Sequence, residues 1–127
     1  MIGLSMQFEP LALDLDGTID EAPLFLRWLS ENWPSKVFIL TYRSDRTKAI
    51  QDLANFKIRY DELVLVSSFR QKAEIIEREG IVVYFDDQDE MTKDIRDSTT
   101  VFKIRNGGNF DFETRKWLYS DETGRRL

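Results

Sequence analysis

The sequence predicts an α/β protein in which a mostly parallel sheet is covered by helices on both faces, a three-layer α/β/α sandwich. Short β-rich runs alternate along the chain with longer amphipathic stretches, which is the pattern of consecutive βαβ units. No repeat, low-complexity linker or change in composition divides the 127 residues, so we expect one domain.

Five short runs rich in Val, Ile, Leu and aromatic residues are the expected strands, because polar or turn-forming residues flank them. They span residues 10–15, 37–41, 63–67, 81–85 and 99–104.

Helices are expected between the strands, over residues 22–33, 44–56, 70–79 and 89–97. Pro23 suits a first helical turn, Pro34 ends the first helix and Gly80 ends the third. In the first helix the spacing places four apolar residues on one face, namely Leu24, Phe25, Trp28 and Leu29.

The alternation ends at Asn106-Gly107-Gly108-Asn109, so we place the core at about residues 8–105 of a single domain, 1–127. Residues 106–127 are expected to form a hairpin or tail packed on that core. Its aromatic residues either pack on the domain or form a surface for a partner, such as a second copy in a homodimer; they are Phe110, Phe112, Trp117 and Tyr119.

The chain contains no cysteine and no histidine. Disulfides, thiolate metal sites, Ser-His-Asp triads and His-ligated zinc are therefore excluded. Any catalysis depends on carboxylates, hydroxyls, lysine, arginine and a metal bound through oxygen.

The formal net charge of −5 disfavours non-specific nucleic-acid binding. The N-terminal residues do not resemble a secretory signal, and no apolar run reaches the ~18 residues of a membrane span. We expect a cytoplasmic protein with no membrane association.

Ligands of an open parallel sheet bind beyond the carboxyl ends of its strands. The polar residues just after each expected strand are therefore the first candidates for a site. They are Asp14 and Asp16, Thr41 and Arg43, Ser67 and Ser68, and Asp86 and Asp87.

Asp14 and Asp16 lie two residues apart at the end of a strand, so continued extended geometry directs both to one side, roughly 6–7 Å apart along the strand. Gly17 permits a sharp turn there. Such acids also occur in ordinary turns. A calcium-binding loop beginning at Asp14 is excluded, because Phe25 occupies the position of its final glutamate.

Asp86 and Asp87 follow the fourth strand, where an aspartate commonly caps a helix. The alternative is a second acidic group that meets the first. Carboxylates close together are unfavourable unless a cation or a shared proton compensates them, and carboxylates with water are the ligands that Mg²⁺ prefers.

Thr41 is either an ordinary β-branched strand residue or a hydroxyl donor to a phosphoryl oxygen. Lys72 is either solvated or directed inward, because it shares a helical stripe with Ile75 and Ile76. An inward ammonium group could offset the charge of a transferring phosphoryl group.

In their order along the chain, these residues resemble the four motifs of the haloacid dehalogenase superfamily. The motifs are Asp14-Leu15-Asp16-Gly17-Thr18, then Thr41, then Lys72, then Asp86-Asp87. The resemblance covers residues 8 to about 105 and implies a Rossmann-like core. It also implies a phosphomonoester hydrolase that depends on Mg²⁺ and forms an aspartyl-phosphate.

By this resemblance, Asp14 is the nucleophile and Asp16 is the general acid/base. Thr41 and Lys72 hold the phosphoryl oxygens, with Gly17 and Thr18 contributing to substrate binding.

The implied metal site contains Asp14, the main-chain carbonyl of Asp16, Asp87 as the main ligand of the last motif, and Asp86 in support. The family often has another acid four residues later, where this chain has Met91, so Asp89 or Glu90 is the expected substitute.

The chain has no insertion large enough for a sizeable cap domain, so it resembles the small capless members with an open site. Such a site suits a macromolecular phosphate, or a small phosphorylated substrate, such as a nucleotide, that a partner subunit encloses. Arg43 is either a contact to the rest of the substrate or a member of a surface salt bridge. The alternative is a catalytically silent module of the same fold that binds phosphate or protein. A two-component receiver domain is disfavoured, because its acidic pair comes first in the chain.

Overall fold

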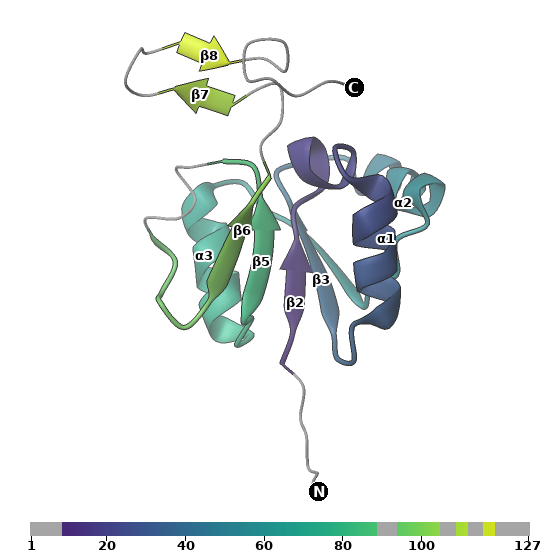
Figure 1. The fold of residues 1–127 in the computed structure, drawn as a ribbon, viewed down its shortest axis with the longest axis horizontal. Coiled ribbons are helices and arrows are strands. Elements are labelled where there is room, and N and C mark those ends of the chain that lie inside the picture. The colour runs from purple at the N-terminus through teal and green to yellow at the C-terminus, as the bar shows by residue number, and fades with distance from the viewer. Residues whose placement is uncertain (1–8, 89–93, 105–108, 112–115, 119–127) are drawn as a thin grey trace, which may run out of the picture.

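The computed structural model of the chain describes residues 9–88, 94–104, 109–111 and 116–118. Five strands form one sheet in which every neighbouring pair is parallel, as the alternation predicted (Figure 1). In chain order they are β2 (Leu11–Leu13), β3 (Val37–Thr41), β4 (Glu62–Leu65), β5 (Val83–Asp86) and β6 (Thr100–Lys103).

The order of the strands in the sheet is β4-β3-β2-β5-β6, which puts the first of them in the centre. The chain adds β3 and β4 on one side of β2 and then crosses to add β5 and β6 on the other side. The direction in which the chain adds strands therefore reverses between β2 and β5. At such a switch point a crevice forms at the carboxyl ends of the two strands. The fold is therefore Rossmann-like, and the crevice lies between the two strands that carry the acidic motifs.

Helices cover both faces of the sheet (Figure 1). Helices α1 (Pro23–Asn32) and α2 (Arg46–Phe56) pack on one face, and α3 (Phe69–Arg78) packs on the other. Side chains of a strand alternate between these faces, so Leu11 and Leu13 belong to the core under α1 and α2, whereas Ala12 belongs to the core under α3.

The predicted helices 22–33, 44–56 and 70–79 agree with the observed ones to within two residues. The predicted helix 89–97 lies mostly outside the described residues. No inserted domain interrupts the alternation of strands and helices between residues 9 and 88, so no cap domain is evident there.

Of the four residues on the apolar face predicted for the first helix, Leu29 packs against the core and the other three are exposed. Leu24, Phe25 and Trp28 are 72%, 50% and 60% exposed, whereas Leu26 and Ser30 are fully buried. The aromatic rings on this outer side still contact one another. Phe25 lies with its ring centroid 6.4 Å from that of Trp28 and 6.1 Å from that of Phe85 in β5. Helical spacing identified an apolar stripe, but that stripe meets the side of α1 that faces the sheet only at Leu29.

Two further strands, β7 (Asn109–Asp111) and β8 (Lys116–Leu118), pair with each other antiparallel as a separate two-stranded sheet. The remainder of the predicted C-terminal segment and the side chains of its aromatic residues lie outside what the structure describes. In the described part of the chain, no helix has the length and apolar character needed to cross a membrane.

Candidate active site

The loop after β2 carries the first acidic motif. Asp14 continues the extended conformation of β2, and its N–H donates to the carbonyl of Phe85 in β5 at 3.0 Å. The chain then turns through Leu15–Ile19, where Gly17 has a φ of 79°, a conformation that glycine adopts at little steric cost. Asp20 closes the turn by accepting a hydrogen bond of 2.7 Å from the Gly17 N–H. The turn thus fixes Asp14 at the end of the central strand.

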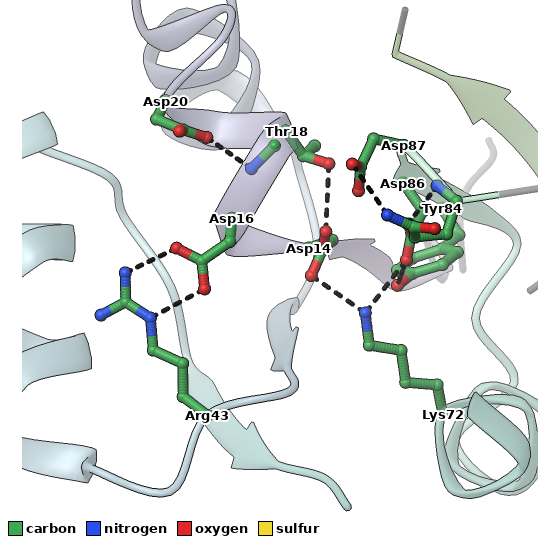
Figure 2. A network of polar contacts seen from close by, with 11 residues as sticks. Asp14, Asp16, Thr18, Asp20, Arg43, Lys72, Tyr84, Asp86 and Asp87 are labelled. Atoms are coloured by element: carbon green, nitrogen blue, oxygen red, sulfur yellow. Dashed lines mark hydrogen bonds and ion pairs between the residues drawn. The ribbon is translucent and has the colours of Figure 1, made fainter. Parts of the chain in front are cut away.

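Lys72 is the centre of a buried ionic network (Figure 2). It comes from the first turns of α3, and its Nζ donates to Asp14 Oδ1 at 2.9 Å and to Asp86 Oδ2 at 3.0 Å. The lysine side chain is only 2% exposed. Thr18 Oγ1 donates to the other oxygen of Asp14 at 3.2 Å. Groups from two separate elements, α3 and the turn after β2, therefore hold the Asp14 carboxylate in one orientation.

Asp86 accepts two further hydrogen bonds. The Tyr84 hydroxyl donates to Asp86 Oδ2, and the Gln88 N–H donates to Asp86 Oδ1 at 2.8 Å. Tyr84 was not among the site residues predicted from the sequence. The available signal was the alternation of β5, which puts positions 84 and 86 on the same face of the strand.

Asp14, Asp86 and Asp87 form a buried acidic cluster in which one carboxylate oxygen of each lies within 4.8 Å of the others. The three acids and the Lys72 ammonium group share this small volume, so the negative charge exceeds the positive charge of the protein groups there. Oxygen-only donors with excess negative charge suit a hard divalent cation such as Mg²⁺. Asp86 already accepts three hydrogen bonds, so Asp14 and Asp87 are the more available ligands.

The protonation of the network reflects its burial. Burial raises the pKa of Asp14 well above its usual range, and the charges of Asp86 and Asp87 raise it further against the opposing effect of Lys72. Burial alone would lower the pKa of Lys72, but the carboxylates of Asp14 and Asp86 outweigh that effect and raise it. Burial and the neighbouring Asp86 likewise raise the pKa of Tyr84, so its hydroxyl remains a donor. The raised pKa of Asp14 indicates that the ionised carboxylate lacks sufficient compensating charge.

Asp16 belongs to a second, more exposed network. Both of its oxygens accept from Arg43, at 2.9 Å from Nε and 2.7 Å from Nη2 (Figure 2). Arg43 Nη1 donates in turn to Asp52 of α2 at 2.7 Å, and Asp52 also accepts from Lys48 at 2.5 Å. The hydrogen bonds that Arg43 donates to Asp16 and Asp52 raise the pKa of Arg43, and those that Asp52 accepts from Lys48 and Arg43 lower the pKa of Asp52. Asp52 was not singled out in the sequence, because its partner Arg43 precedes α2 rather than sharing that helix.

The carboxyl ends of the strands enclose a cavity of about 520 Å³. Both acids of the first motif line it, together with Lys72 and Asp87 from the later motifs. The lining residues are Asp14, Asp16, Tyr42, Ser68, Phe69, Lys72, Asp87 and Gln88. The structure therefore brings five residues that the sequence marked as candidates into one cavity, namely Asp14, Asp16, Ser68, Lys72 and Asp87.

Thr41 is not among the residues that line this cavity. It is fully buried, and its hydroxyl has no hydrogen-bond partner in the described part of the chain. Its neighbour Tyr42 lines the cavity instead. Asp86 is buried behind the cavity lining, where it binds Lys72. The predicted substitutes Asp89 and Glu90, and Met91, lie outside the described residues.

No protein-family model, curated protein or solved structure matches this chain. The geometry of the cavity and its chemistry are therefore the basis on which a function can be argued.

Proposed function

We propose that this protein is a magnesium-dependent phosphomonoester hydrolase of the haloacid dehalogenase type that acts through an aspartyl-phosphate. The observation that supports the proposal most is the placement of Asp14, Lys72 and Asp87 in one cavity at the switch point of a parallel sheet, with Asp14 and Asp87 in a cluster of three acids.

Asp14 is the proposed nucleophile. A carboxylate oxygen of Asp14 attacks phosphorus, the bond from phosphorus to the ester oxygen breaks, and an acyl phosphate forms on Asp14. The hydrogen bonds from Thr18 and Lys72 orient the carboxylate before the reaction. Lys72 also offers the positive charge that the phosphoryl oxygens need as the bond to the ester oxygen breaks.

Asp16 is the proposed general acid and base. It gives a proton to the departing ester oxygen and later takes a proton from the water that attacks phosphorus, which releases phosphate and restores Asp14. Asp16 is able to do this only when Arg43 releases at least one of its oxygens, because both accept hydrogen bonds from Arg43. The side chain of Asp16 is 60% exposed, so the pair can open without disturbing the core.

Asp14 and Asp87, with the main-chain carbonyl of Asp16 and with Asp86 in support, are the residues that would hold the metal. When bound, Mg²⁺ would supply positive charge between the acidic cluster and the phosphoryl oxygens.

The test is phosphate release from p-nitrophenyl phosphate, with Mg²⁺ and with a chelator. We expect turnover only with Mg²⁺, and none from Asp14→Asn. For Asp87→Asn we expect that the Mg²⁺ concentration needed for half-maximal activity rises about tenfold or more. The matched control is Asp97→Asn, which alters an exposed acid just before β6, at the opposite edge of the sheet. An Asp14→Asn protein with the turnover of the control would contradict the assignment of the nucleophile.

The second candidate is a module that binds phosphate or a protein without turnover. The bidentate pair of Asp16 with Arg43 is the observation that favours it, because both oxygens of the proposed general acid already accept hydrogen bonds from Arg43. Inactivity of the wild type toward p-nitrophenyl phosphate, nucleotides and sugar phosphates, together with measurable phosphate binding, would support this candidate instead.

A further inference from the structure

Two aromatic rings line the same cavity as the charged residues. Tyr42 directly follows β3, and Phe69 is the first residue of α3, which follows β4, the neighbour of β3 in the sheet. Their centroids lie 6.0 Å apart and their planes are inclined by 59°. Because the rings are tilted rather than stacked, Phe69 does not cover the face of Tyr42, and Tyr42 is 58% exposed.

Tyr42 forms a wall between two hollows. On one side is the cavity that contains Asp14 and Lys72, and on the other is a hollow of about 420 Å³ that is lined partly by Ser44 and Ser67. Phe69 is partly buried and packs against the core under α3, which fixes it as a rigid part of the cavity wall. Two aromatic rings beside the charged groups of Asp14 and Lys72 suit a ligand with one planar apolar part and one anionic part.

We propose that the substrate is a free nucleoside monophosphate, whose base packs against Tyr42 and Phe69 while its phosphate lies at Asp14 and Lys72. This inference rests on the proposed phosphatase function and names the substrate class of that site. The cavity of about 520 Å³ falls within the range of roughly 300–1,000 Å³ that is typical of small-molecule sites. Stacking of a base on an aromatic side chain is tolerant of sequence and strong enough to select a substrate.

A free nucleotide fits the charges better than the end of a nucleic acid does. The chain has a formal net charge of −5, and a polynucleotide backbone requires a series of basic contacts. Arg43, which binds the cavity residue Asp16, is already paired with both Asp16 and Asp52. Together, Lys72 and a metal bound at the acidic cluster would offer positive charge for one phosphate group, and the two rings offer an aromatic surface for one base.

The kinetic test compares adenosine 5′-monophosphate with ribose 5-phosphate, which share the ester linkage and differ by the base. We expect the wild type to prefer the nucleotide by about tenfold in kcat/KM, mainly through a lower KM. Tyr42→Leu should remove this preference, and Tyr42→Phe should retain it. The matched control is Trp28→Leu, which removes an aromatic residue of similar exposure, 60%, from α1 outside the cavity.

A binding measurement separates this inference from the proposed function. Titration calorimetry of the two ligands with the Asp14→Asn protein requires no turnover, and we expect the same preference and the same dependence on Tyr42. A preference in binding without hydrolysis by the wild type would refute the phosphatase and leave the nucleotide site standing. Equal binding and hydrolysis of the two ligands, or a preference that survives Tyr42→Leu, would refute the nucleotide site. Tighter binding of a terminally phosphorylated oligonucleotide than of the mononucleotide would also refute it.

Discussion

Two ionic networks border the cavity, and they differ mainly in their exposure to solvent. In the first, Lys72 binds Asp14 and Asp86, and all three side chains are at most 7% exposed. In the second, Arg43 binds Asp16 and Asp52, with Arg43 21% and Asp16 60% exposed. The distances between charged atoms are similar, from 2.7 to 3.0 Å. Ion pairs of similar length therefore contribute differently to stability in the two networks.

The difference follows from the solvent. Removing one partner of a buried pair leaves a charge without water or a counter-ion, whereas water and salt compensate an exposed charge. The Lys72 network is thus suited to holding the proposed nucleophile still. The Arg43 network is suited to opening, which the proposed role of Asp16 requires.

The largest expected effect is that of Lys72→Met. It leaves three buried carboxylates without their ammonium group and should lower the free energy of unfolding by about 3–5 kcal/mol. Urea denaturation with a chelator present measures it. The control is Lys48→Met, whose exposed pair with Asp52 spans one helical turn and should cost only about 0.3–0.5 kcal/mol. Equal losses for the two variants would remove the distinction between the networks.

Tyr84→Phe should have the next largest effect. It removes the hydroxyl that donates to the buried Asp86 carboxylate and leaves a cavity of only one oxygen atom. A hydrogen bond to a buried charged group contributes about 1.5–3 kcal/mol, so we expect a loss of that size in urea denaturation. Unchanged stability would mean that Lys72 and the Gln88 N–H suffice to compensate Asp86.

Asp14→Asn should stabilise the chelated protein by about 0.5–2 kcal/mol near pH 8 while abolishing turnover. The pKa of Asp14 is raised in the folded state, so the folded protein binds this proton more tightly than the unfolded chain does. The destabilisation by Asp14 is absent below the unfolded pKa of about 3.9 and grows as the pH rises through the folded-state value. Denaturation of both proteins across that pH range measures it, and a difference that shrinks with rising pH would contradict it.

Arg43→Met should have the smallest effect on stability, about 0–1 kcal/mol, because Asp16 is 60% exposed to water and Asp52 keeps its pair with Lys48. The effect should decrease between low and high salt, whereas that of Lys72→Met should change little. Denaturation at two salt concentrations measures both. A stronger salt dependence for Lys72→Met than for Arg43→Met would contradict the distinction between the two networks.

Much of the site followed from local sequence. Parallel strands end at one edge of a sheet, so the acids after β2 and β5 were expected to meet, and Asp14, Asp86 and Asp87 do. The inward direction of Lys72 followed from its stripe with Ile75 and Ile76, and all three are buried. The partner of Asp16 did not follow, because no periodicity relates residue 16 to Arg43 or Arg43 to Asp52.

By itself, the sequence determined the alternation of strands and helices, the parallel sheet and the edge at which the acids gather. These features depend on periodicity and on chain connectivity, both of which can be read along one segment at a time. Tertiary structure alone decided which face of α1 is buried. It also decided that Asp14 is buried with Lys72, whereas Asp16 is exposed and paired with Arg43. Burial depends on what packs from elsewhere in the chain, and burial sets the cost of each charge.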